Sequence, residues 1–263
     1  MNRQLKDDLK LALDPVKFAQ ELGIEPDDWQ RQALTWTGKK MALVTGRQMG
    51  KSTTCAILAL HKILYKPKSL VLLVSPSSRQ SQELFRKVND LIKLFPGRVE
   101  KVEDNKLSME LKNGSRCVSL PGSESTIRGY SAVDLLLADE SSRIPENIFA
   151  TVSPFLSVSQ GQMILLSTPA GKRGFLYEIM FNGDPSWERI QADATQCPRI
   201  SPEFLESEKK ILGDFYFKQE YLIQWLEPEG SLFTLEEIEQ AVSHEYDAWD
   251  FSIKGGFLYA GKA

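Results

Sequence analysis

The sequence predicts a three-layer α/β fold in which a mostly parallel central sheet lies between helices. Short apolar runs, such as Met41-Ala42-Leu43-Val44 and the run at 69–75, recur along the chain and alternate with longer segments of helical spacing. Strands that are apolar on both faces are typical of parallel sheets covered by helices. At 263 residues the chain is long enough for one large domain, or for one and a half.

The first elements follow from apolar spacing and from helix-stop signals. Leu5, Leu9, Leu13 and Phe18 recur at helical spacing, so residues 1–26 are expected to form one or two amphipathic helices. The next expected elements are a short helix opening at Trp29-Gln30, a strand at 41–45, a helix at 51–65 ended by Lys66-Pro67, and a strand at 69–75.

The alternation then continues to the last quarter of the chain. Ser77 is expected to cap a helix that runs to Phe95 and ends at Pro96-Gly97. Residues 98–120 alternate in polarity and contain Asn113-Gly114, which predicts a β-hairpin. The remaining expected elements are strands at 133–138, 162–167 and 187–193, and helices at 146–158, 174–181 and 203–226.

Composition excludes several classes of protein. Hydrophobic residues make up 42% of the chain, yet no apolar run approaches membrane-spanning length, and the polar N-terminus is no secretion signal. Cys55, Cys117 and Cys197 are scattered and odd in number, which indicates reduced thiols in a cytosolic protein. His61 and His244 lie too far apart in the sequence to indicate a metal site.

Charge is spread unevenly along the chain. Residues 201–263 contain 5 basic and 13 acidic residues, whereas residues 1–200 contain 27 basic and 22 acidic residues. A mildly basic core is compatible with nucleic-acid binding but does not require it. Interleaved acids mean that a solvated surface explains the basic residues of 79–116 at least as well as DNA contact does. These candidate DNA contacts are Arg79, Arg86, Lys87, Lys93, Arg98, Lys101, Lys106, Lys112 and Arg116.

The most informative segment is Thr45-Gly46-Arg47-Gln48-Met49-Gly50-Lys51-Ser52, directly after the apolar run at 41–44. Its last three residues match the Gly-Lys-Ser/Thr end of a phosphate-binding loop (P-loop), whereas Thr45 stands where a glycine is usual. We therefore expect residues 45–52, together with Thr53, to bind a nucleoside triphosphate.

Each residue type in the loop has a physical role. Gly50 lets the backbone approach a phosphate, and the N–H groups of 46–52 can surround it at the positive end of a helix. Lys51 is expected to bridge the β- and γ-phosphates, and the Ser52 hydroxyl to bind Mg²⁺. Arg47 adds a fixed positive charge where negative charge develops during phosphoryl transfer.

The second half of the site is expected where the apolar strand at 133–138 ends in Asp139-Glu140. Ligands of open α/β sheets lie beyond the carboxyl ends of the strands. Asp139 is therefore expected to complete the Mg²⁺ site with Ser52, and Glu140 to activate the attacking water. Asp134, at the start of the strand, is the weaker candidate for a metal ligand.

Three further features are candidates for a role in the site. Thr168, in Ser167-Thr168-Pro169, can sense the γ-phosphate at the end of its strand. Gln30, beside Trp29, can pair with adenine N6 and N7, although a buried Trp with a surface Gln explains the pair almost equally well. Arg128 is either an arginine finger for a neighbouring subunit or a surface or DNA-contacting arginine.

Together, these motifs resemble the ATPase domain of the large terminase subunit of tailed bacteriophages. The resemblance rests on the loop at 46–52, Asp139-Glu140-Ser141-Ser142, Ser167-Thr168-Pro169 and Ile127-Arg128-Gly129, and it extends from Trp29 to about residue 226. It implies an additional-strand P-loop fold (ASCE) and Mg²⁺-dependent ATP hydrolysis. It also implies that Arg47 acts in its own site and Arg128 in the site of a neighbour.

The resemblance further implies partners and domains. It implies a motor that moves double-stranded DNA into a procapsid, as a homo-oligomeric ring, pentameric when assembled, on the portal protein and with the small terminase subunit. The location is the cytoplasm of the infected host. We expect an ATPase domain at 1–226, a linker or lid at 227–256, and the start of a C-terminal nuclease domain at 257–263, with no nuclease activity in this chain.

Other classes of protein fit less well. A helicase-like translocase needs a second core, and the roughly 95 residues after Pro169 are too few for one. A nucleotide-gated assembly protein does not need Glu140 beside Asp139. A small-molecule kinase would need an acceptor-binding lid, which the sequence does not indicate.

Overall fold

The computed structural model describes residues 3–95, 99–122, 127, 129–227, 249–254 and 257–262. The chain divides into two compact units, Met1–Leu226 and Glu227–Ala263. In the second unit, β9 (Trp249–Lys254) and β10 (Phe257–Lys262) form an antiparallel hairpin. The assignments of 227–256 to a linker or lid and of 257–263 to a nuclease domain stay predictions.

The first unit is built on a sheet of eight described strands in the order β3-β4-β5-β2-β6-β7-β1-β8. Six neighbouring strands are parallel, whereas β3 and β4 add an antiparallel edge. The strands are β1 (Lys40–Thr45), β2 (Leu70–Ser75), β3 (Lys101–Asp104), β4 (Ser108–Leu111), β5 (Arg116–Pro121), β6 (Leu135–Asp139), β7 (Gln162–Ser167) and β8 (Trp187–Ala192). Because β7 lies between β1 and β6, the predicted additional-strand fold is confirmed.

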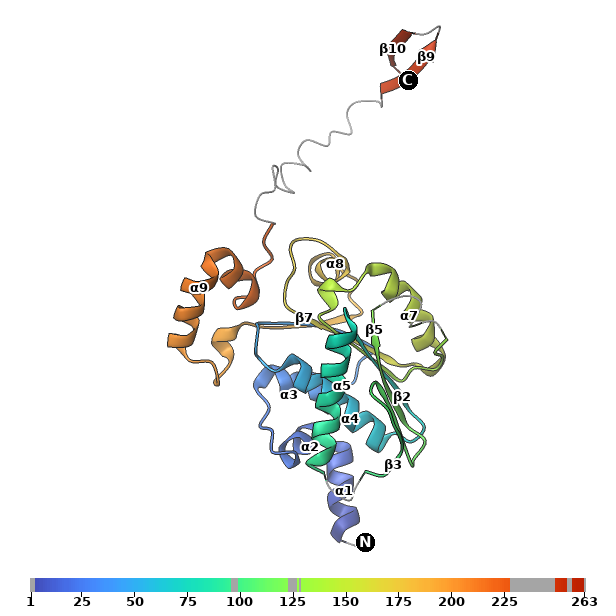
Figure 1. Ribbon diagram of the computed structural model, residues 1–263, viewed down its shortest axis with the longest axis vertical. Coiled ribbons are helices and arrows are strands. Elements are labelled where there is room, and N and C mark those ends of the chain that lie inside the picture. Colours follow the sequence, from blue (N-terminus) through green and yellow to red (C-terminus); the bar gives the residue numbers. More distant parts are fainter. Residues whose placement is uncertain are drawn as a thin grey trace. The chain divides into compact units, whose positions relative to one another are not determined.

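Helices cover both faces of this sheet (Figure 1). One group of helices, which includes α4, packs against one face of the sheet, and a second group packs against the other face. The helix α9 follows β8. The first group is α1 (Arg3–Leu13), α2 (Pro15–Glu21), α3 (Asp28–Thr35), α4 (Lys51–Tyr65) and α5 (Ser78–Lys93); the second is α7 (Glu146–Ser159) and α8 (Phe175–Phe181); α9 spans Pro202–Glu220. Two short 3₁₀ turns are η1 (Ser141–Arg143) and η2 (Ala194–Gln196).

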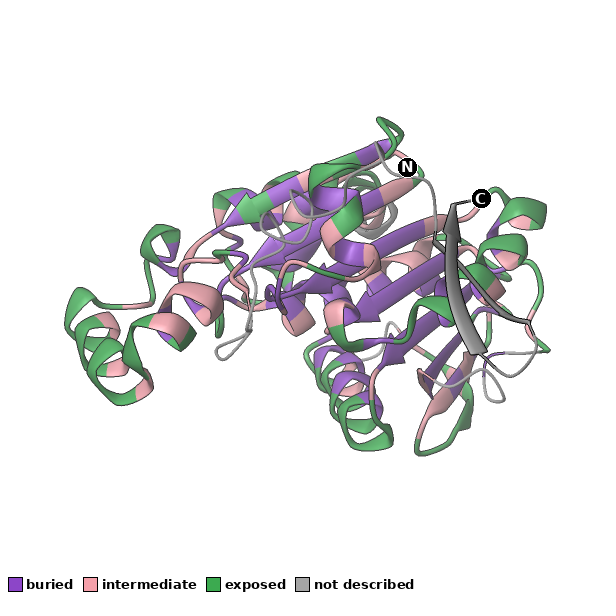
Figure 2. Cartoon of the chain, turned by 90° about the horizontal axis from the view of Figure 1, so that it is seen from above, coloured by how far each residue is buried: buried purple, intermediate pink, exposed green. Residues whose placement is uncertain are grey.

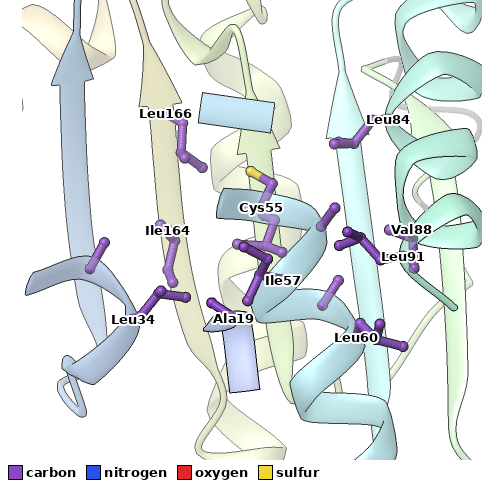
Figure 3. Packing of buried hydrophobic residues seen from close by; sticks show 14 of the residues in the cluster. Ala19, Leu34, Cys55, Ile57, Leu60, Leu84, Val88, Leu91, Ile164 and Leu166 are labelled. Carbon is purple, nitrogen blue, oxygen red and sulfur yellow. The ribbon is translucent and has the colours of Figure 1, made fainter. Parts of the chain in front are cut away.

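Alternate side chains of each strand enter two separate apolar layers. In β6, Leu135 and Leu137 pack with α4 and α5, whereas Leu136 and Ala138 pack with α7 and α8. The first layer is seen from close by in Figure 3, and the continuous burial of the central strands is seen in Figure 2. The strands are therefore apolar on both faces because both faces are covered.

The structure departs from the predicted elements at two places. The expected hairpin at 98–120 is a meander of three strands, since β4 pairs antiparallel with both β3 and β5, and β5 joins it to β2 in parallel. The helix expected at 203–226 ends at Glu220 and bends at Gly213, whose φ of 76° interrupts helical geometry. Ser77 does cap α5, since its side chain accepts a hydrogen bond from Gln80 N.

The three cysteines are free and buried, and burial raises the pKa of the Cys117 thiol to about 12. Burial of this kind is typical of structural cysteines. No helix among the described residues is both long and apolar enough to cross a membrane.

Asp134 is a structural residue that precedes β6, at the amino ends of the parallel strands, whereas the predicted site lies at their carboxyl ends. Its Oδ2 accepts a hydrogen bond from Leu70 N at 2.8 Å, which ties the start of β6 to the start of β2. Its Oδ1 forms an ion pair with Lys66 Nζ, and only 11% of the side chain is exposed. This carboxylate therefore satisfies a backbone donor of the sheet.

We predict that Asp134→Ala lowers the free energy of unfolding by about 1–3 kcal/mol, because Leu70 N loses its acceptor near the core. Urea denaturation measures this loss. Asp134→Asn keeps an acceptor and should recover much of the stability, and Asp104→Ala, in an exposed ion pair, should cost little. Equal stability of Asp134→Ala and wild type would contradict this role.

Candidate functional site

The phosphate loop lies between β1 and α4, as predicted. Gln48 and Gly50 both have positive φ, 61° and 95°, and left-handed residues of this kind occur in loops whose backbone N–H groups bind anions. A Cβ on Gly50 would also lie 3.0 Å from Gln30 Nε2. Glycine is therefore required there for both backbone conformation and space.

Two N–H groups at the start of the loop are already engaged. Gly46 N donates to Ala192 O at 3.0 Å, and Arg47 N donates to Glu220 O at 2.7 Å. The expectation that the N–H groups of 46–52 can surround a phosphate fails for these two, because each already donates to a backbone carbonyl. Phosphate donors from the loop are therefore expected from Gln48 onward, and the Arg47 side chain is exposed.

Lys51 is held over the loop. Its Nζ donates to Gly46 O at 2.9 Å and to Thr45 O at 3.2 Å, and the residue is only 7% exposed. Burial lowers the pKa of Lys51, whereas the carboxylates of Glu140 and Asp139 oppose that shift. An ammonium group is thus placed between the loop and the acidic pair.

The predicted metal ligands lie side by side. Ser52 Oγ donates to Asp139 Oδ2 at 2.8 Å, although the two residues are far apart in the sequence. Both are hard oxygen donors, the type that Mg²⁺ prefers, and they leave most of its octahedral positions to phosphate oxygens and water. Among the described residues no group of three or more His, Cys, Asp and Glu side chains could hold a metal.

Glu140 has an unusual backbone conformation directly after β6. Its φ of 53° and ψ of 41° are left-handed, which is uncommon for a residue other than glycine, and its N–H lies 3.1 Å from Asp139 Oδ1. Burial raises the pKa of Glu140, while the Lys51 ammonium opposes this shift. A backbone outlier with a half-buried carboxylate is typical of a functional position.

The end of β7 is tied to the turn after Glu140. Ser142 Oγ lies 2.7 Å from Ser167 Oγ and donates to Thr168 O at 3.1 Å. Ser141 Oγ donates to Leu166 O at 3.3 Å. Ser167 and Thr168 are both buried, so the predicted sensing segment is packed against the acidic turn.

A cavity of about 690 Å³ opens beside the other end of the loop. Its lining includes Gln30, Gly50, Thr53 and Arg199. Gln30 is buried, so the alternative explanation of a buried Trp beside a surface Gln is wrong for this residue. Trp29 packs in the core with α4 instead, and is not among the described residues that line the cavity.

Two charged pairs near the site were missed from the sequence. Arg199 forms a two-pronged ion pair with Asp27 beside the cavity, at 2.6 and 2.7 Å. Arg143, three residues after Glu140 in the sequence, places its Nη2 3.3 Å from Glu220 Oε1. Only the closeness of Arg143 to Glu140 in the sequence was a signal for either pair.

Arg128 lies outside the described residues, as does Arg98. Several of the other candidate DNA contacts are paired with acids: Arg86 with Glu83, Lys93 with Asp90, Lys101 with Asp104 and Lys112 with Glu100. These ion pairs favour an ordinary solvated surface for that part of the chain.

A family model described as "Terminase large subunit, T4likevirus-type, N-terminal" matches residues 42–240. Terminase large subunits of Thermus virus P23-45 and Escherichia phage T5 are 25% and 26% identical to this chain, over 83% and 71% of it. The chain spans about half the length of these curated relatives, at 52% and 44%.

Solved structures agree in fold. The large terminase ATPase domain of Thermus phage P74-26 has a TM-score of 0.69 at 22% identity, covering 80% of this chain and 98% of that one. The large terminase of bacteriophage HK97 has a TM-score of 0.66 at 15% identity, covering 81% and 55%. Because the family model matches well over half of its length, this chain belongs to the family of the N-terminal part of the terminase large subunit.

Proposed function

We propose that this chain is the ATPase motor domain of a terminase, which hydrolyses ATP with Mg²⁺ to move double-stranded DNA into a procapsid. One observation carries the proposal: Lys51, Ser52, Asp139 and Glu140 converge at the carboxyl edge of the parallel sheet. A large terminase of similar fold, from a thermophilic bacteriophage, has been solved in complex with ADP and with ATP-gamma-S.

Binding begins at the phosphate loop. N–H groups from Gln48 onward donate to phosphate oxygens at the start of α4, where the helix dipole favours negative charge. Lys51 exchanges its two carbonyl contacts for oxygens of the β- and γ-phosphates. Arg47, exposed at the loop, adds positive charge near the transferred group.

Ser52 and Asp139 are the residues that would hold Mg²⁺. When bound, the ion would neutralise phosphate charge during transfer. The Ser52–Asp139 hydrogen bond shows that the chain alone already brings the two oxygens together. Little rearrangement of the backbone is therefore needed to present both oxygens to one cation.

Glu140 acts as the general base. Burial raises the pKa of the Glu140 carboxyl, which makes the carboxylate a better proton acceptor, and the Lys51 ammonium opposes this shift. The turn that contains Glu140 is bonded to Ser167 and Thr168 at the end of β7. Loss of the γ-phosphate can thus alter the position of β7 through this turn.

The wider assembly is part of the proposal. A homo-oligomeric ring, pentameric when assembled, would act on the portal protein with the small terminase subunit, in the cytoplasm of the infected host. Arg128 would complete the site of the neighbouring subunit. The absence of nuclease activity in this chain stays a prediction.

We predict that Glu140→Gln lowers the turnover number for ATP by about 10²–10⁴-fold, because the amide cannot accept the proton of water. The dissociation constant for ATP should change little, since the loop and Lys51 are intact. Phosphate release and equilibrium ATP binding measure the two quantities. Glu188→Gln, an exposed residue of β8, is the matched control, and full turnover by Glu140→Gln would exclude Glu140 as the base.

Arg128 is tested by mixing variants. We predict that the specific ATPase activity of wild type rises with protein concentration and that Arg128→Ala abolishes this rise, since an arginine finger contributes about 10³-fold or more. Arg128→Ala mixed with Glu140→Gln should regain activity, because one variant supplies the base and the other the arginine. If the mixture is inactive and the wild-type rate per chain does not depend on concentration, Arg128 does not act between subunits.

A further inference from the structure

The segment from the last residue of β8 to the end of α9 contacts the phosphate loop at three points. Ala192 O and Glu220 O accept from the N–H groups of Gly46 and Arg47 at the start of the loop. Arg199 Nη2 donates to Met49 O, at 3.3 Å, near its far end. One segment thus holds both ends of the loop.

Arg199 has a second and stronger partner. Its Nη1 and Nη2 donate to Asp27 Oδ1 and Oδ2 at 2.6 and 2.7 Å, and the Asp27 side chain is only 7% exposed. A planar guanidinium bonded to both carboxylate oxygens fixes distance and angle, which a lysine cannot do. Asp27 is the residue that precedes α3, so the ion pair fixes the start of that helix.

From the backbone of Asp27, which forms a capping box with Gln30 at the start of α3, the hydrogen bonds continue to the loop. Asp27 N donates to Gln30 Oε1 at 2.9 Å, and Gln30 Nε2 donates to Thr54 Oγ1 at 3.0 Å. Thr54 Oγ1 in turn donates to Gly50 O at 3.2 Å. The chain of bonds therefore closes on the loop one residue beyond Met49, which Arg199 holds directly.

This network determines which way the Gln30 amide faces. A glutamine amide has two donor hydrogens and two acceptor lone pairs, so one of each remains after the bonds to Asp27 N and Thr54 Oγ1. Adenine presents an acceptor at N7 and a donor at N6, whereas guanine presents acceptors at both N7 and O6. A fixed amide beside the cavity can therefore distinguish the two bases, but a freely rotating amide cannot.

We propose that Arg199 and Asp27 are positioning residues that hold Gln30 and the Met49 carbonyl, and that they thereby set the affinity and base selectivity of the nucleotide pocket. The inference rests on the proposed function, since it concerns the same nucleotide. It assigns no contact with the reacting atoms to either residue. The effect should therefore appear in binding and in ATP–GTP discrimination, and not in the rate of the chemical step.

The test compares Arg199→Ala, Arg199→Lys and Asp27→Ala with wild type in the full chain, by equilibrium binding of ATP and GTP and by steady-state ATPase kinetics. We expect Arg199→Ala to raise the dissociation constant and KM for ATP by about tenfold, because the loop and Gln30 must then be ordered when the nucleotide binds. The preference for ATP over GTP should fall, and kcat should stay within about twofold. Lys218→Ala, which removes an exposed ion pair of α9, should behave as wild type.

Two further comparisons separate the inference from simpler explanations. Arg199→Lys keeps the charge but not the two-pronged geometry, so an affinity below that of wild type supports positioning, and it replaces Arg199→Ala if that variant does not fold. The double variant Asp27→Ala/Arg199→Ala should lose little more than either single variant, because the residues act through one contact.

Unchanged ATP affinity and base selectivity in both Arg199 variants would overturn the inference, as would a fall in kcat with KM unchanged. If the wild-type chain hydrolyses ATP and the Arg199 variants bind ATP as tightly as wild type, the inference is wrong and the proposed function is not affected. A wild-type chain that does not bind ATP rejects the proposed function and the inference together.

Discussion

The hydrogen bond from Ser52 to Asp139 depends on the register of three strands. Ser52 is fixed to β1 through the loop, Asp139 ends β6, and β7 lies between them with Leu166 opposite Asp139. Since side chains alternate along a strand, a slip of one residue would turn Asp139 toward the wrong face. The acidic pair meets the loop only because the parallel register brings these strand ends to the same edge.

Two apolar layers cover both faces of β6 and stabilise it in the sheet. Leu135 and Leu137 of β6 enter one layer, and Leu136 and Ala138 enter the other, so a shifted strand would still be apolar but would misplace its ends. Lys51 and Asp139 are both buried at the edge of these layers, where an isolated charge would be costly. Their opposite charges offset part of that cost, which makes the polar site compatible with its apolar support.

The sequence was sufficient for features set by neighbouring residues. The strand, loop and helix at 40–65 follow from an apolar run, a glycine pattern and helical spacing, and the acidic pair follows from the end of β6. Contacts set by the tertiary fold were not predictable: Arg199 meets Asp27 across most of the chain, and Glu220 meets Arg47 through its backbone carbonyl. A backbone acceptor has no side-chain signature, so the loss of two loop N–H donors could not be foreseen.

The same contacts explain why the phosphate loop is not an independent element. Its first two N–H groups bond to Ala192 O and Glu220 O, and its far end bonds to Arg199 and, through Thr54, to Gln30. Any shift of the loop on binding phosphate must therefore stretch bonds to the segment at 192–221 or displace that segment. Because Glu220 ends α9 and pairs with Arg143 in the turn that follows Glu140, a displacement of this segment would also strain the contact between α9 and that turn.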